Sequence, residues 1–229
     1  MIKILVWTKI KDRRSLYVCI ENTTPNTMPS FNSQTLLIEH IALVYDISTV
    51  VRKRFGALSA EELNQRLSPE KWSIAQCLEH LNTYGRYYLP LLEQAIVYGE
   101  VRHQSAQPTF RSSWLGNYFA NTMRPKANGT IAMPMKAFKA HTPAHHLDAS
   151  AVIDEFMVQQ QQLLQLLERA QQVNIGALTV PISIARWIKL SVGDTFRFLI
   201  AHEQRHLLQA ERVADWLSEN RILGHKLSV

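Results

Sequence analysis

Two histidines, His202 and His206, stand four residues apart in FRFLIAHEQRHLLQAERV, residues Phe196–Val213. Apolar residues before and after them follow a three-and-four spacing, which predicts a helix with both imidazoles on its core-facing side. Side chains four apart on a helix have Cβ atoms about 5–6 Å apart, so both rings can reach one cation. From spacing alone, a hydrogen-bonded pair of core histidines is the alternative interpretation.

Other residues with metal-binding side chains lie in two further predicted helices. His80 flanks the apolar side of one helix and could face the histidine pair. Cys77, three residues earlier, could supply a thiolate, but a lone cysteine on an apolar helix face is more often a small buried side chain. His40 is adjacent to the core-facing side of another helix and has no partner at helical spacing, so we expect a structural role.

His141 and His145 repeat the four-residue spacing within HTPAHH. Pro143 between them argues against a regular helix, so the two rings need not point the same way. We therefore expect solvated loop histidines at both positions.

Four long segments have the apolar spacing of amphipathic helices. Their approximate bounds are residues 33–55, 73–98, 150–173 and 191–217. The second and fourth begin with S-x-x-Q and S-x-x-D, which are N-terminal capping patterns, and Ser59 with Glu62 makes the same pattern for a short turn. Pro90 removes a backbone donor from the second helix and is expected to kink it.

The connection between the second and third helices, residues 99–148, contains several prolines and one short predicted helix, Trp114–Thr122. A connection of this length in a compact domain is typical of a crossover along a bundle, or of a lid over a site. The sequence therefore predicts an all-α fold, a four-helix bundle over residues 33–220 with a long crossover between helices two and three.

The two ends of the chain are expected to lie outside the bundle. Residues 1–27 carry two short β-prone runs, ILVW and LYVCI, around the charged turn KDRR. The extension over residues 1–32 is therefore expected to be a hairpin or flexible, and residues 221–229 to be a C-terminal tail.

Composition limits the function classes. Of the 229 residues, 25 are Lys or Arg and 19 are Asp or Glu, but the basic residues are scattered, so we do not expect a nucleic-acid partner. The two cysteines cannot form a disulfide framework. No secretory h-region or apolar run near about 18 residues is evident. We expect a cytoplasmic protein that does not span a membrane.

The motifs EKWSIAQCLEHLNTYGRYY, RPKANGTIAMPMKAFKAHTP and FRFLIAHEQRHLLQAERV give the chain a resemblance to the DinB-like family of four-helix-bundle metalloenzymes, over residues 33–218. Its most specific parts are a W-S helix start leading to a histidine, and H-x-x-x-H followed three residues later by Gln209. The resemblance implies a divalent ion, zinc or nickel in most cases, held by His80, His202 and His206, and it implies a homodimer. Relatives include transferases and isomerases that use a low-molecular-weight thiol.

Three neutral imidazoles would leave open coordination positions, as in a catalytic site. We therefore expect a metal-dependent transferase or hydrolase acting on a small-molecule substrate by thiol-dependent transfer or hydrolysis. Tyr84 and Glu203 are candidate proton-handling residues; the alternatives are a buried core tyrosine and a solvated glutamate. The alternative function is a metal-binding bundle without catalysis, in a structural, interaction or stress-related role.

The crossover is expected to cover the metal end of the bundle and to set substrate choice. Four of its side chains are candidates for contacting an anionic substrate. They are Trp114, Tyr118, Arg124 and Lys126.

Overall fold

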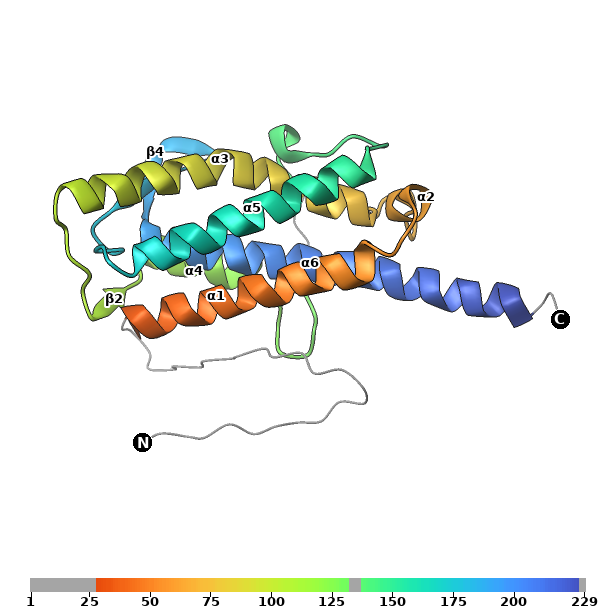
Figure 1. Ribbon diagram of the computed structural model, residues 1–229, viewed down its shortest axis with the longest axis horizontal. Helices are drawn as coiled ribbons and strands as arrows, with labels where there is room; N and C mark the ends of the chain where they lie inside the picture. Colours follow the sequence, from red (N-terminus) through yellow and green to blue (C-terminus); the bar gives the residue numbers. More distant parts are fainter. Residues whose placement is uncertain (1–27, 132–136, 227–229) are drawn as a thin grey trace.

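The computed structural model describes residues 28–131 and 137–226, with side chains described as far as Arg221. Its described part is built on four long helices (Figure 1). α1 and α3 each pack against both α5 and α6. The predicted all-α four-helix bundle is therefore confirmed. The bounds are α1 Ser33–Val50, α3 Ile74–Val101, α5 Ala149–Ala170 and α6 Val192–Lys226.

Helix direction explains the long crossover. In Figure 1, α3 and α5 run in the same direction and α1 and α6 run in the opposite one. Two consecutive helices with the same direction need a connection that returns along the bundle. That connection contains β2 (Thr109–Arg111), α4 (Trp114–Met123) and the 3-10 turn η2 (Lys139–His141), and α4 packs against α6. The short helix predicted within the crossover is confirmed.

Side-chain caps begin the helices where the sequence predicts. Ser73 Oγ accepts a hydrogen bond from the Gln76 backbone N–H at 3.1 Å, and Gln76 Oε1 accepts from the Ser73 N–H at 3.1 Å. α2 (Ala60–Asn64) begins with the same box, made by Ser59 and Glu62. Each box satisfies two backbone donors that the first helical turn leaves unpaired.

The helix ends agree with the prediction in part. α1 ends in a π-helical turn, η1 (Val51–Phe55), so helix one does reach residue 55. α3 continues through Pro90 without interruption. α6 continues past residue 217 to Lys226 and projects beyond the bundle, so most of the expected tail is helical (Figure 1).

The N-terminal extension is only partly described. Residues 1–27, where a hairpin or flexible segment is expected, lie outside the described residues. The last residues of the extension form β1 (Ser30–Asn32), which pairs antiparallel with β2 of the crossover. Asn32 then caps α1 by accepting a hydrogen bond from the Thr35 N–H at 2.9 Å.

A β-hairpin between α5 and α6 was not expected from the sequence. β3 (Thr179–Ile182) pairs antiparallel with β4 (Ala185–Ser191). Pro181 made the segment look like a loop, but a two-stranded ribbon has two edges, where a missing N–H is tolerated. Val180 and Leu190 are buried, so one face of the hairpin covers the bundle.

The apolar core is divided into two clusters along the bundle. One contains Tyr84 and Phe198, and the other contains Leu78 and Leu207. On α3, Leu78 and Tyr84 stand on either side of His80. On α6, Phe198 and Leu207 stand on either side of the histidine pair. The polar site is therefore enclosed between two apolar layers, which exclude water from its flanks.

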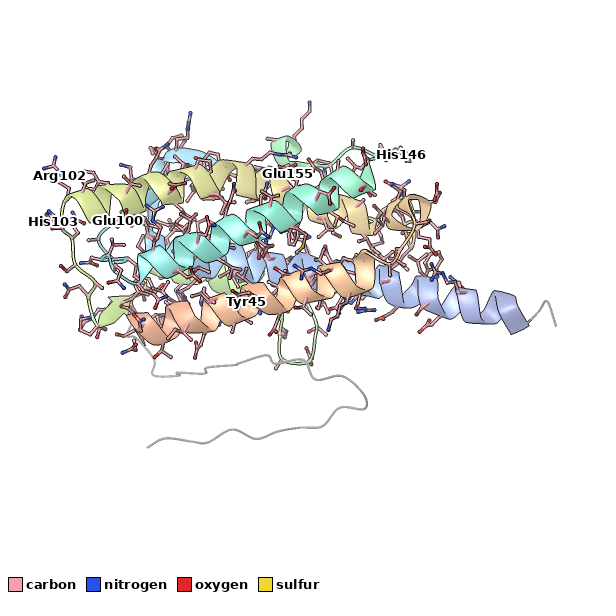
Figure 2. The ribbon with its side chains drawn as sticks, in the orientation of Figure 1. Tyr45, Glu100, Arg102, His103, His146 and Glu155 are labelled. Atoms are coloured by element: carbon pink, nitrogen blue, oxygen red, sulfur yellow. The ribbon has the colours of Figure 1, made fainter. Side chains whose placement is uncertain are left out.

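Surface ion pairs link α3 to α5. Arg86 contacts both Glu79 of its own helix and Glu155 of α5, at 2.8 and 2.5 Å. Figure 2 labels Glu155 on the side of α5 that faces α3. Exposed pairs of this kind contribute about 0–1 kcal/mol each, so we attribute the packing of these helices mainly to the apolar core.

The helical segment Ser33–Phe55 is long and apolar enough to cross a membrane by length and composition alone. The core helix of a water-soluble bundle passes the same test, and this segment packs against α5 and α6. In the most apolar 18-residue stretch of this segment, 33% of the residues are buried in the bundle.

Candidate metal centre

Three buried histidines from two helices meet at one point. The Nε2 atoms of His80 on α3 and His202 on α6 are 3.2 Å apart. One ligand nitrogen from each of these two and from His206 fits within a 4.8 Å span. Two nitrogens bound tetrahedrally to one zinc ion would be about 3.3 Å apart, given Zn–N bonds of about 2.0–2.1 Å. The expectation that His80 faces the α6 pair is confirmed.

Hydrogen bonds orient two of the three rings. His80 Nδ1 lies 2.6 Å from the carbonyl oxygen of His141, and His206 Nδ1 lies 2.8 Å from Gln209 Oε1. Because both oxygens only accept, each Nδ1 carries the proton and donates it. Each Nε2 then has a free lone pair, and outer partners of this kind are typical of metal-bound histidines. This gives Gln209 a specific task, which is to hold the ring of His206.

The third ring borders a second, smaller cavity. His202 Nδ1, Glu203 Oε2 and Gln160 Oε1 are buried and have no hydrogen-bond partner among the described residues. Their residues line a cavity of about 10 Å³, which has room for about one water molecule. A water there would let His202 donate through Nδ1, as the other two rings do.

The carboxylate of Glu203 is buried in this part of the bundle. Its Oε1 accepts a hydrogen bond from Gln160 Nε2 at 2.9 Å. Burial raises the pKa of Glu203 to about 7, and the bond from Gln160 opposes the rise. The interpretation of Glu203 as a solvated glutamate is therefore wrong. Glu203 lies against the small cavity behind His202, not among the lining residues of the large one.

The three histidines are uncharged at neutral pH. Burial lowers the pKa of His80 to about 4, against the opposing hydrogen bond to His141. Burial, followed by neighbouring charge, holds the pKa values of His202 and His206 well below the ordinary value. A metal ion binds only the neutral form of imidazole, so the donor set is ready to bind a cation without first releasing protons.

Two aromatic side chains frame the cluster. The ring centre of Trp72 lies 4.8 Å from that of His80 and 5.6 Å from that of His206. The ring centre of Tyr84 lies 5.1 Å from His80 and 4.5 Å from His202. Trp72 and Ser73, the W-S pair of the sequence, therefore have separate roles. Trp72 packs on two histidines, and Ser73 caps α3.

The hydroxyl of Tyr84 stays protonated. Burial, with a smaller effect of Tyr88, raises the pKa of Tyr84 to about 12. A phenol in that state can donate a hydrogen bond at neutral pH, and it is a poor base. Tyr84 is one of the two residues predicted to handle protons, and it lines the large cavity beside the histidines.

His141 belongs to the site, contrary to expectation. Its ring is buried, its Nδ1 donates to Thr83 Oγ1 at 2.9 Å, and its carbonyl oxygen orients His80. The expectation of a solvated side chain is wrong for His141, whereas His145 is exposed as expected. Spacing could not reveal this role, because every residue type has a backbone carbonyl and the contact depends on where the crossover passes.

Cys77 and His40 have the structural roles expected of them. Cys77 is fully buried, and burial raises the pKa of its thiol to about 12, so it is not a thiolate at neutral pH. His40 is buried on α1 outside the three-histidine cluster. Burial and then the positive charge of Arg197 lower the pKa of His40 to about 3.

A cavity of about 680 Å³ adjoins the histidines, and its size suits a small-molecule ligand. The crossover forms part of its wall through Met123, Phe138 and Thr142, as expected. The side chains proposed from the sequence for substrate contact do not line it. Trp114 and Tyr118 are 66% and 49% exposed and stack on each other, with ring centres 5.8 Å apart.

Arg124 and Lys126 are also absent from the described lining of that cavity. The positive charge of Arg124 acts instead on Glu39 and His40 of α1. The backbone N–H of Lys126 donates to the Thr130 carbonyl at 2.9 Å in a turn. None of the four residues therefore lines this cavity in the described part of the chain, and their contact with an anionic substrate stays a prediction.

A family model described as the DinB superfamily matches residues 37–210. The matched range includes all three clustered histidines and Gln209. Searches of curated proteins and of solved structures give no match.

Proposed function

The chain belongs to the DinB superfamily, and from that premise we propose that it is a metal-dependent enzyme acting on a small molecule. One observation carries the proposal: three neutral imidazoles converge in the wall of a cavity of about 680 Å³. A structural zinc site is closed by four protein ligands, whereas a catalytic one has three and keeps a position open. Among the described residues, these three histidines form the cluster able to hold a metal.

The donor set fits zinc or nickel, since imidazole suits both ions. His80, His202 and His206 would hold the ion through Nε2, with His141 and Gln209 orienting two of the rings. Such an ion supplies Lewis acidity and lowers the pKa of a bound water or thiol. This chemistry supports transfer of a low-molecular-weight thiol or hydrolysis as the reaction.

Two further residues have proposed roles. Tyr84 lines the cavity and is protonated, so it would donate a hydrogen bond to substrate oxygen or sulfur where negative charge develops. Glu203 stands behind His202, so it would act through that ring by holding its Nδ1 proton through a water in the small cavity.

The experiment compares metal-free protein with protein reconstituted with zinc or nickel, on a panel of thiol-conjugation and ester-hydrolysis substrates. We expect turnover only with metal, and its loss in His206→Ala. His146→Ala is the matched control, because His146 is exposed near the start of α5 (Figure 2). Bound metal without turnover on any substrate would contradict the proposal and favour a metal-binding bundle that does not catalyse.

A further inference from the structure

The large cavity carries more positive than negative charge. Its described lining includes the cations Lys71, Arg205 and Arg212 and one acid, Glu70. Glu70 is exposed and accepts a hydrogen bond from Ser68 Oγ at 2.8 Å. Because the histidines are neutral, the cavity attracts anions even before a metal ion is bound.

Arg205 is the buried cation of this set. It stands between His202 and His206 on α6, and it is 4% exposed. Its Nη1 donates to the backbone carbonyl of Thr122 at 3.3 Å, which orients the guanidinium at the cavity wall. The planar fork of a guanidinium matches the two oxygens of an oxyanion.

Arg212 extends the positive charge along the same helix. It is seven residues after Arg205, so both lie on one side of α6, about 10.5 Å apart along its axis. Arg212 is exposed and donates to the Gly129 carbonyl at 2.9 Å. Positive charge therefore runs along the cavity from an exposed position to the buried histidines.

A divalent ion on the three histidines would lie beside Arg205, and the two positive charges would repel each other. An anion between them would remove that repulsion and contact both. We propose that Arg205 binds an oxyanion group of the substrate, a carboxylate or a phosphate, with Arg212 as a second, outer contact. The substrate is then a small anion that reaches the histidines with another of its groups. This rests on the proposed function, because it takes the cavity as the substrate site.

The test measures binding of two probes, succinate and inorganic phosphate, to the zinc-loaded protein by calorimetry. We expect at least one probe to bind the wild type. Arg205→Met, which keeps an unbranched stem of similar length, should weaken that binding about tenfold or more, and Arg212→Met should weaken it less. Arg52→Met is the control, since Arg52 is exposed on η1 and should leave binding unchanged.

A zinc titration of the same variants separates loss of an anion contact from loss of the fold. Arg205→Met should bind zinc as tightly as the wild type or more tightly, because a neighbouring positive charge is gone. If Arg205→Met loses zinc binding, probe binding is measured in Arg205→Lys instead. That variant keeps the positive charge but lacks the planar guanidinium group. Weaker probe binding by Arg205→Lys with normal zinc binding supports the proposal, and unchanged probe binding overturns it.

Two results would overturn the inference outright: neither probe binds the wild type, or Arg205→Met binds both probes as the wild type does. Its failure is distinct from that of the proposed function. Probe binding through Arg205 without turnover on any substrate contradicts the enzyme assignment alone. Turnover that is unaffected in kcat and KM by Arg205→Met contradicts the anion site alone.

Discussion

Single hydrogen bonds set the tautomer and the ring orientation of two of the histidines. His80 and His206 each donate from Nδ1 to an amide or peptide oxygen, so each Nε2 has its lone pair directed to the common point. Replacing one acceptor leaves a ring free to rotate or to take the other tautomer. The site should therefore be sensitive to residues that never touch the ion.

Gln209→Ala tests this for His206. Removing the Oε1 acceptor should weaken zinc or nickel binding about 10–100-fold, the usual effect of losing such a partner. Competition with a chromogenic chelator measures the affinity. Gln204→Ala is the control, because Gln204 lies on the same helix and does not line the cavity. Equal affinities in Gln209→Ala and the wild type would contradict the role assigned to Gln209.

The pKa of His40 predicts a loss of stability in acid. Its folded-state pKa of about 3 lies below the unfolded value of about 6.5, so between these values the unfolded chain binds a proton that the folded one does not. The free energy of unfolding should be at its full value above about pH 6.5 and fall as the pH drops toward 3.

His40→Leu should remove this contribution. Between about pH 7 and pH 4.5, its free energy of unfolding should fall by about 2 kcal/mol less than that of the wild type. Urea titrations at both pH values measure it. The three clustered histidines contribute alike to both proteins and cancel in the difference. His146→Leu, at an exposed position, should behave as the wild type does. The same pH dependence in His40→Leu and the wild type would mean that His40 binds its proton equally in the folded and the unfolded protein, which contradicts the lowered pKa.

Residue types and spacing predicted part of the site. His202 and His206 lie on one side of α6 because helix geometry places residues four apart there. The caps at Ser59 and Ser73 follow from local sequence in the same way. The contribution of His141 depends on the path of the crossover, which local spacing does not determine.

The crossover is attached to α6 by a buried polar cluster. The Asp194 carboxylate accepts hydrogen bonds from the backbone N–H of Ser113 at 3.0 Å, from the hydroxyl of Ser112 and from Arg197 at 3.2 Å. The sequence suggested that Asp194 caps its own helix. Ser191 does cap α6, through the Asp194 N–H at 3.0 Å, but the Asp194 side chain binds the segment that begins α4.

Gly116→Ala tests how closely α4 packs at this cluster. A methyl group at Gly116 would overlap the side chain of Asp194, which its hydrogen bonds hold in place. We expect a loss of about 1–3 kcal/mol in the free energy of unfolding, despite the better helix propensity of alanine. Gly176→Ala is the control, because its nearest contact is 3.4 Å away, and it should change stability by less than about 0.5 kcal/mol. Similar stabilities for both variants would contradict the close packing.

Helices were easier to predict than strands here. Long amphipathic periods predict α3, α5 and α6, and serine caps predict where α3 and α6 begin, because these signals are local. β1 pairs with β2 although the whole of α1 and α3 lies between them in sequence, and no local pattern reveals such a distant partner. The segment that forms the β3–β4 hairpin contains Pro181, which in the sequence indicates a loop.

In its described part, the molecule is a bundle in which three buried histidines lie between two apolar clusters of the core. Two apolar clusters enclose three neutral imidazoles, and the crossover covers them while leaving a cavity of about 680 Å³. An ion that binds only the folded chain should stabilise it, by about 2.7 kcal/mol at a hundredfold excess over Kd. Fold and metal binding are then coupled through His80, which joins α3 to α6.

Metal stoichiometry with matched variants tests the three-histidine site most directly. Equilibrium dialysis against zinc or nickel, with elemental analysis, should give one ion per chain for the wild type and His146→Ala. His80→Ala and His206→Ala should each lose most of it while keeping their helical content. X-ray absorption of the loaded wild type should show nitrogen ligands at about 2.0–2.1 Å from zinc. Undiminished metal in His80→Ala, or no metal in the wild type, would contradict the account.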